Sequence, residues 1–262
     1  MRKKILIVFI SLLSMLVISY LLWIIILSNP NLSYSHETKF NQVTIYHNQA
    51  LDKQAETIIT DALEIIKKSE LYDKERKIKL CLNDDKIYPK LFPIETYAFT
   101  LNNTSILKMG EYKFDENLVE LYWNEKDVYQ EIDLTWLLAH EFTHNLQFGA
   151  NEDYVKNTTK RELNWKLEGH ADYIARNFKN DGKLKEKISE FLIKHKKGDD
   201  WIEVNLDKEG KKQVQQYYNY YNKYSLLIQY LLEEKGMNYH EICNLETDID
   251  KIYNEMIEWR NK

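Results

Sequence analysis

Apolar and polar residues alternate along several short segments in the first half of the chain. A period of two is typical of β-strands with one buried face. It predicts strands over residues 42–47, 77–82, 97–101 and 118–123. Between the first two segments, residues 50–69 carry Ala and Ile at helical spacing, which predicts one amphipathic helix.

The second half of the chain has a different periodicity. From residue 133 onward, apolar residues recur as they do on one face of a helix. This spacing predicts helices over residues 134–148, 162–178, 184–194, 211–234 and 249–259. Strands followed by helices predict an α+β fold, with a small N-terminal mixed-sheet lobe that includes a helix and then a mainly helical C-terminal lobe.

The N-terminus holds an almost unbroken apolar run over residues 5–28. A helix that crosses the hydrocarbon layer of a membrane needs roughly 20 such residues. Arg2, Lys3 and Lys4 precede the run, and positive charge of this kind stays on the cytoplasmic side. The run therefore predicts a single-pass transmembrane signal-anchor in the cell membrane.

Such an anchor divides the chain into four parts. They are a cytoplasmic tail at residues 1–4, the span at residues 5–28, a polar linker at residues 29–41 and an extracytoplasmic domain at residues 42–262. The alternative is a cleaved signal peptide, although the apolar core of such a peptide is usually about 7–15 residues long. Ser33 and Ser35 offer small residues for a cleavage site, so this alternative stays open.

Composition and charge narrow the classes of partner. The chain has 41 acidic and 36 basic residues and a net charge of -5, so we expect no nucleic-acid partner. Cys81 and Cys243 are its two cysteines, too few for a disulfide framework. We interpret them as two buried small apolar residues, and a bond between them stays open.

The segment LLAHEFTHNLQ carries the strongest chemical signal in the chain. His140 and His144 are four positions apart, so a helix places both imidazoles on one face. Two imidazoles in that arrangement can share a Zn²⁺ ion. Glu141 follows the first histidine, where its carboxylate can act as general base toward a water molecule. A helix with two partly buried structural histidines is the alternative.

The sequence also indicates how this helix begins, ends and packs. Asp133 precedes it and is a candidate N-cap, and Gly149 is a candidate C-terminal stop. Leu134, Leu138 and Phe142 form the apolar side that we expect to face the core.

A catalytic zinc site has a third protein ligand. Glu168 in the segment NWKLEGHADYIAR is our candidate, and Asp172 lies four residues later on the same helical face. Asp172 would accept the N–H of a ligand histidine, His140 in our interpretation, and so orient its ring. Glu162 is the alternative third ligand, and a solvated face with two carboxylates is the plain alternative. His170 points away from Glu168 on a helix, so we interpret it as a structural or surface histidine.

The pair HEFTH and EGHAD resembles the gluzincin clan of zinc metallopeptidases, to which thermolysin belongs. The resemblance implies a thermolysin-like zincin architecture and the hydrolysis of peptide bonds. Matched position by position, it implies zinc ligands at His140, His144 and Glu168, the general base at Glu141, and a carboxylate that orients a ligand histidine at Asp172. It also implies that a strand near residues 118–123 pairs with the substrate backbone. The metzincin pattern fails, because Gln147 and Ala150 stand where it requires Gly and His.

A tyrosine-rich segment follows, YYNYYNKYSLLIQYLLEEKG, and it resembles a stretch of peptidase MA-like domains. Matched onto that stretch, Tyr221 would reach the zinc site as a catalytic residue, where a phenol can donate a hydrogen bond to an oxyanion. Tyrosines at helical spacing also serve in packing. Tyr218, Tyr224 or no tyrosine at all therefore stay open.

These observations together predict a membrane-anchored zinc peptidase that acts on a peptide or protein substrate. One alternative is a catalytically inactive, membrane-anchored binding module with the same fold, in which Glu141 would have no role. The other is zinc-dependent hydrolysis of a non-peptide amide or ester.

Overall fold

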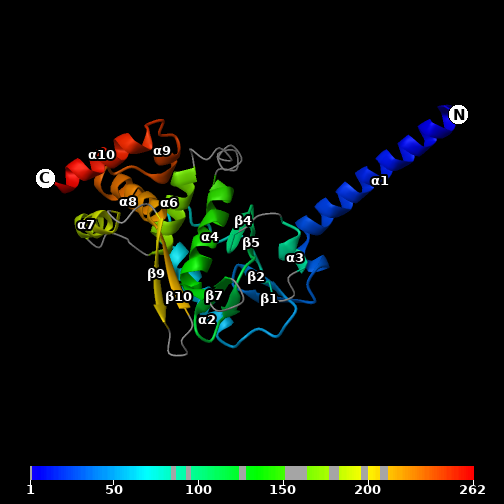
Figure 1. Cartoon of the computed structure of the whole chain (residues 1–262), viewed down its shortest axis with the longest axis horizontal. Helices are drawn as coiled ribbons and strands as arrows, with labels where there is room; N and C mark the ends of the chain where they lie inside the picture. Colours follow the sequence, from blue (N-terminus) through cyan, green and yellow to red (C-terminus); the bar gives the residue numbers. More distant parts are fainter. Residues whose placement is uncertain are drawn as a thin grey trace.

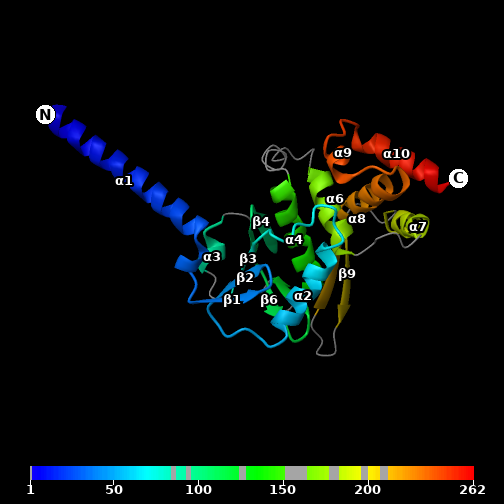
Figure 2. The ribbon, with the colours of Figure 1, turned by 180° about the vertical axis from the view of Figure 1, so that it is seen from behind.

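The computed structural model describes residues 2–83, 87–92, 96–123, 128–150, 164–176, 183–195, 200–206 and 212–262. These residues form a mixed α+β fold with two five-stranded sheets. Figures 1 and 2 show the fold from opposite sides, with helix α4 (Leu134–Ala150) in the middle, between the first sheet and the C-terminal helices.

The first sheet has the strand order β1-β2-β3-β5-β4. Its strands are β1 (His36–Phe40), β2 (Val43–His47), β3 (Ile78–Cys81), β4 (Ala98–Leu101) and β5 (Thr104–Leu107). The inner strands run parallel, and the outer strands β1 and β4 pair antiparallel with their neighbours. β2, β3 and β4 lie within predicted strand segments. β1 pairs with β2 from within residues 29–41, which we expected to be a linker.

The second sheet has the strand order β6-β7-β8-β10-β9. Its strands are β6 (Glu111–Lys113), β7 (Leu118–Trp123), β8 (Val128–Asp133), β9 (Asp200–Leu206) and β10 (Lys212–Tyr218). β8 and β10 are parallel, and the other pairs are antiparallel. β7 occupies the predicted strand 118–123 but lies between β6 and β8. Along residues 118–120, where β6 pairs with it, β7 is therefore not an edge strand, and its expected pairing with a substrate stays a prediction.

β9 and β10 correct the expectation that the chain from residue 133 onward is almost wholly helical. The predicted helix over residues 211–234 is strand β10, followed by α8 (Asn219–Gln229) and the π-helix η3 (Tyr230–Glu234). Pairing of β10 with β8, which is distant in sequence, overrides the helical preference of its Gln-rich segment.

The structure describes further helices before and after α4 in the chain. They are η1 (Pro30–Leu32), α2 (Ala55–Ile66), α3 (Ile87–Lys90), α6 (Asn164–Ala175), α7 (Leu184–His195), α9 (Tyr239–Cys243) and α10 (Ile249–Arg260). Helix α4 packs against α2, α6 and strand β4, and α6 packs against α8. The apolar side of α4 is fully buried, as predicted, at Leu134, Leu138 and Phe142.

The sequence predicted a residue at each end of α4, and the structure bears out one of the two. The Asp133 carboxylate accepts a hydrogen bond from the backbone N–H of Trp136 at 2.7 Å, which confirms Asp133 as the N-cap. Gly149 lies inside α4, so the expectation that it ends the helix is wrong.

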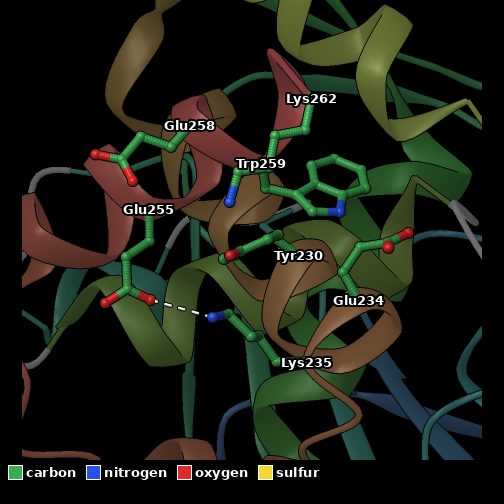
Figure 3. A pocket seen from close by; sticks show the side chains of 7 residues that line it. All are labelled: Tyr230, Glu234, Lys235, Glu255, Glu258, Trp259 and Lys262. Atoms are coloured by element: carbon green, nitrogen blue, oxygen red, sulfur yellow. Dashed lines mark ion pairs between the residues drawn. The ribbon is translucent and has the colours of Figure 1, made fainter.

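A hollow of about 480 Å³ lies between η3 and α10 (Figure 3). Seven residues line it: Tyr230, Glu234, Lys235, Glu255, Glu258, Trp259 and Lys262. Lys235 forms an ion pair with Glu255 at 3.2 Å, and its ammonium lies 5.5 Å from the ring centre of Tyr230. The hollow is thus lined by both acidic and basic side chains, which balance one another. None of its lining residues is a candidate site residue of the sequence analysis.

The N-terminal helix α1 (Arg2–Ser28) extends away from the sheets and the other helices (Figure 1). Across the described part of the chain, no helix has both the length and the apolar character needed to cross a membrane. This finding overturns the predicted transmembrane signal-anchor at residues 5–28 and the predicted single-pass location in the cell membrane.

Cys81 and Cys243 are both buried. The interpretation of the two cysteines as small buried apolar residues is confirmed, and they do not form a disulfide.

Candidate metal site

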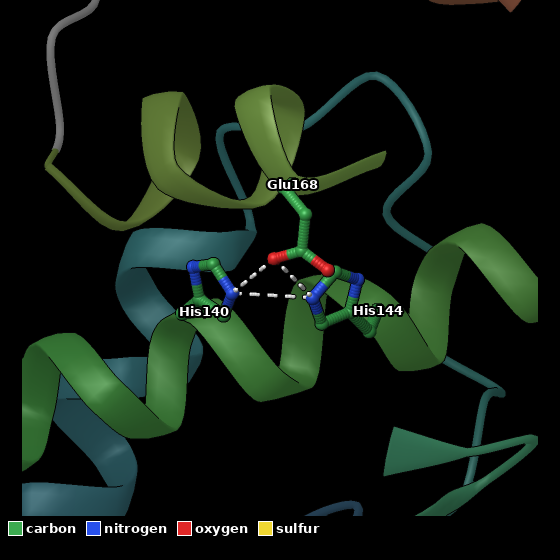
Figure 4. A group of neighbouring side chains, drawn as sticks. All are labelled: His140, His144 and Glu168. Carbon is green, nitrogen blue, oxygen red and sulfur yellow. Dashed lines mark hydrogen bonds and ion pairs between the residues drawn. The ribbon is translucent and has the colours of Figure 1, made fainter. Parts of the chain in front are cut away.

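Three side chains that the sequence singled out meet between α4 and α6. His140 and His144 come from α4, and Glu168 reaches them from α6 (Figure 4). The Nε2 atoms of the two histidines are 3.1 Å apart. Oε2 of Glu168 lies 3.3 Å from Nε2 of His140 and 3.6 Å from Nε2 of His144. The three residues each offer one ligand atom within 4.8 Å of the others, so they could hold a metal ion.

Local and tertiary structure contribute differently to this group. The helical repeat of α4 brings the two imidazoles together, with ring centres 4.8 Å apart and planes at 84°. The carboxylate arrives through the packing of α6 on α4, where Ile174 and Ala175 of α6 belong to the same apolar core as Phe142 of α4. Glu168 itself keeps 20% of its side chain exposed, so the group is reachable from solvent.

The chemistry of the three ligand atoms fits a cation. Nδ1 of His144 lies 2.8 Å from Oε1 of Gln147, which can only accept, so the ring proton is on Nδ1. In the neutral ring the lone pair is then on Nε2, facing the other two residues. The ionised Glu168 carboxylate also presents lone pairs alone. Lone pairs that converge in this way repel one another unless a metal ion or a proton lies between them.

The pKa values follow the same electrostatics. Burial alone lowers the pKa of His144, but the charge of Glu168 and its hydrogen bond outweigh burial and raise the pKa to about 9. Burial alone raises the pKa of Glu168, but the charge of His144 and hydrogen bonds from both histidines hold it well below its usual range. The site therefore favours an ionised carboxylate next to positive charge.

Glu141 is buried next to this group and is 4% exposed. Burial is the main reason why its pKa is raised, and the two histidines and a hydrogen bond from Thr100 act in the opposite direction. Thr100 lies on β4, and its hydroxyl oxygen is 2.7 Å from Oε2 of Glu141. Sequence reasoning found Glu141 but missed Thr100, because β4 reaches α4 only through the tertiary fold.

Asp172 lies on α6 and is fully buried. Its Oδ2 accepts a hydrogen bond from Nε of Arg176 at 2.6 Å. Among the described residues, neither its Oδ1 nor Nδ1 of His140 has a hydrogen-bond partner. The expected bond between these two atoms is not formed in this structure, and a role for Asp172 stays a prediction.

Two of the three candidate tyrosines border the site. The ring centre of Tyr221 on α8 lies 6.5 Å from that of His140, with the planes at 72°. The pKa of Tyr224 is raised by burial and by the negative charge of Glu168, so this phenol also lies within the electrostatic influence of the site. The side chain of Tyr218 lies outside the described residues.

Gly169 is a contributor that sequence reasoning missed. A Cβ atom at this position would lie 2.7 Å from the carbonyl oxygen of Tyr224. Glycine therefore allows α6 and α8 to approach closely, and the approach carries Tyr221 and Tyr224 to the site. The available signal was a glycine inside a predicted helix, which often has a packing reason.

The remaining candidates lie outside the group. His170 is buried and stacks on Tyr239 with ring centres 3.8 Å apart, and burial lowers its pKa to about 3. It is a structural histidine in this fold. Glu162, the alternative third ligand, lies outside the described residues.

Comparisons of the chain with protein-family models, with curated proteins and with solved structures found no match.

Proposed function

We propose that the chain is a zinc-dependent peptidase in which His140, His144 and Glu168 hold the ion. The spacing of the three ligand atoms carries this proposal. At metal–ligand distances of about 2.0–2.1 Å, a tetrahedral ion separates its ligand atoms by about 3.3 Å. The separations here are 3.1, 3.3 and 3.6 Å, so the three atoms already lie at the corners of such a tetrahedron.

The ligand types favour zinc over the alkaline-earth ions. Ca²⁺ and Mg²⁺ take sets of oxygen ligands, whereas imidazoles suit zinc and its neighbours in the first transition row. Two histidines and one carboxylate also leave a fourth coordination position open, as in catalytic zinc sites. When bound, zinc would supply a Lewis acid that lowers the pKa of water and polarises a carbonyl group.

Glu141 is the proposed general base. Its burial raises the pKa of the carboxyl group, which helps a base that must first take a proton and later give it back. In peptide hydrolysis, Glu141 takes a proton from the attacking water and passes it to the leaving amine. Thr100 holds Oε2 of this carboxylate and so limits its rotation.

Tyr221 is the proposed donor to the oxyanion of the tetrahedral intermediate. Its ring lies beside His140, with the two ring centres 6.5 Å apart. We also propose that Asp172 accepts the N–H of His140. A bond between Oδ1 of Asp172 and Nδ1 of His140 would satisfy two buried atoms that otherwise lack partners among the described residues.

Strand β4 replaces β7 as the proposed site of substrate pairing. It ends the strand order of the first sheet, so one of its edges has no neighbouring strand among the residues that the structure describes. It also packs on α4, and Thr100 connects it directly to Glu141. An extended peptide added to this edge would gain backbone hydrogen bonds beside the base.

A peptide substrate is proposed because the HEFTH and EGHAD segments resemble gluzincins. The test measures zinc content and the cleavage of a mixed peptide library, read by mass spectrometry, for the parent chain and two variants. We expect about one zinc per parent chain, retained zinc without cleavage in Glu141→Gln, and loss of zinc in His144→Ala.

Each other outcome has a distinct meaning. Zinc in the parent without cleavage of any peptide would favour the inactive binding module. Cleavage of simple amides or esters but of no peptide would favour the third reaction class. Equal zinc in the parent and in His144→Ala would contradict the site itself.

A further inference from the structure

Gln147 lies on α4, one turn beyond His144, and it is 2% exposed. Its two amide atoms face different partners. Oε1 lies 2.8 Å from Nδ1 of His144, and Nε2 lies 2.9 Å from the carbonyl oxygen of Leu167 on α6. Gln147 thus links the second histidine of the site to the helix that carries Glu168.

The Leu167 carbonyl decides the orientation of this amide. A carbonyl oxygen can only accept, so the Nε2 donor of Gln147 must face it, and Oε1 must face His144. Because Oε1 can only accept, Nδ1 of His144 must donate. In the neutral ring, Nε2 is then left with the lone pair, and this atom faces the metal site. The orientation of one amide therefore selects the nitrogen that is offered to a metal.

The Gln147 amide also contacts Tyr239 on α9 and His170 on α6. Its Nε2 lies 3.2 Å from the hydroxyl oxygen of Tyr239 and 3.2 Å from Nδ1 of His170. The Tyr239 hydroxyl in turn donates to the carbonyl oxygen of Lys166 at 3.2 Å, and its ring stacks on His170. All of these groups are buried, so rotation of the amide would leave several polar atoms without partners.

We propose that Gln147 is a positioning residue that fixes the ring tautomer and orientation of His144 and thereby raises the affinity of the site for zinc. The inference rests on the proposed zinc site but not on peptide hydrolysis. The proposed site then includes α9, because Tyr239 contacts the Gln147 amide and that amide contacts His144.

Two variants of Gln147 separate this role from simple packing. Gln147→Met keeps the size of the side chain but removes the acceptor for Nδ1–H of His144. Gln147→Glu keeps an acceptor oxygen for Nδ1–H of His144, but it replaces the Nε2 donor that faces the Leu167 carbonyl by a second acceptor. Gln229→Met is the matched control, because Gln229 is equally buried and its amide donates to Glu233 at 3.0 Å rather than to a histidine of the site.

The first measurement is the zinc dissociation constant of the full chain, obtained by competition with a chelator. We expect Gln147→Met to weaken zinc binding about 10- to 100-fold, the range found when the partner of a ligand histidine is removed. We expect Gln147→Glu to lose less affinity than Gln147→Met and Gln229→Met to bind zinc as the parent does. Equal affinity in Gln147→Met and the parent would overturn the proposal.

The second measurement is nuclear magnetic resonance of the chain with ¹⁵N-labelled histidine. The His144 signal is the one that disappears in His144→Ala. We expect a slowly exchanging Nδ1–H on His144 in the zinc-loaded parent, its loss in Gln147→Met, and its retention in Gln147→Glu. A parent in which the proton of His144 is on Nε2 would overturn the proposal.

The same signal can be sought without metal, at a pH high enough to keep the ring neutral. This keeps the two proposals apart. If the parent binds no zinc, the proposed function fails, while the tautomer of His144 is still decided by the metal-free spectrum. If the parent cleaves peptides but Gln147→Met binds zinc normally, the role of Gln147 alone is refuted.

Discussion

The hydroxyl group of Thr100, on edge strand β4, donates to Oε2 of Glu141, on the central helix α4, at 2.7 Å. The backbone oxygen of Glu141 and the hydroxyl of Ser105 also lie near this hydroxyl, at 3.0 and 2.9 Å. A threonine hydroxyl has one proton, and the ionised carboxylate is the strongest and nearest acceptor. The first sheet and the proposed general base are therefore joined by a charge-assisted hydrogen bond.

Thr100→Val should impair catalysis and leave zinc binding intact. The Thr100 hydrogen bond lowers the pKa of Glu141, so its loss raises that pKa further and leaves less of the base ionised. We expect kcat to fall about 10- to 100-fold, with the acidic limb of the pH profile moved to higher pH. Steady-state rates across pH and the zinc content check this, and Thr100→Ser should restore both rate and profile. An unchanged acidic limb in the valine variant would contradict the assignment.

Gly169→Ala should destabilise the fold and disturb the tyrosine side of the site. The new Cβ would meet the backbone of Tyr224 at 2.7 Å, and backbone cannot turn aside as a flexible side chain can. Overpacking of this kind costs about 1–3 kcal/mol. Urea unfolding measures the change in the free energy of unfolding.

Gly149→Ala is the matched control for that substitution. Gly149 is also helical, but its Cβ would meet only the end of the Arg76 side chain, at 3.2 Å, and that side chain can move. Alanine is favoured over glycine inside a helix by about 0.5–1 kcal/mol, so this variant should be as stable as the parent or more stable. Equal stability of the two alanine variants would show that the α6–α8 contact is not tight.

The sequence predicted the local part of the site better than the distant part. The positions of His140, His144 and Glu141 on one helix follow from the helical repeat, and Asp133 was recognisable as its N-cap. The approach of Glu168 could be proposed from its chemistry, but its 3.3 Å separation from His140 depends on how α6 crosses α4.

The misses share a physical cause. β10 became a strand because β8 and β9 flank it, although its own residues favour a helix, and β7 became an inner strand because β6 lies beside it. Thr100 and Gly169 act through contacts with segments that are far away in sequence. Local periodicity contains no information about such neighbours, so these features could not be read from the chain alone.

Glu168→Gln should weaken zinc binding without loss of the fold. The amide keeps the shape of the side chain but removes the negative charge that complements a divalent cation, and an amide oxygen is a weaker ligand for zinc than a carboxylate. We expect the zinc dissociation constant to rise by at least about tenfold. Chelator competition measures this constant, and circular dichroism checks that the variant is folded. Zinc affinity equal to that of the parent would remove Glu168 from the ligand set.

Added zinc should stabilise the parent chain and not His144→Ala. A ligand that binds only the folded state raises the free energy of unfolding by about 2.7 kcal/mol at a concentration of 100 times its dissociation constant. Thermal unfolding with and without zinc measures the effect, and a chelator should reverse it. A shift of the same size in His144→Ala would indicate that zinc binds elsewhere on the chain.

The metal-free chain should lose stability as the pH rises from about 6 to above 9. The pKa of His144 is raised from its usual 6.5 to about 9, so its contribution is fully present below about pH 6.5 and is lost as the pH rises through 9. At 1.36 kcal/mol per pKa unit, the loss is at most about 3 kcal/mol. The lowered pKa of Glu168 belongs to the same interaction, and its contribution is lost only in acid, so it does not add to this loss. Urea unfolding in the presence of chelator at about pH 6 and pH 9.5 measures the difference. In Glu168→Gln the largest raising charge is absent, while burial and the smaller raising effects of Glu141 and Gln147 remain, so the loss between these pH values should become smaller. A parent chain that is equally stable at both pH values would contradict the ion pair between His144 and Glu168.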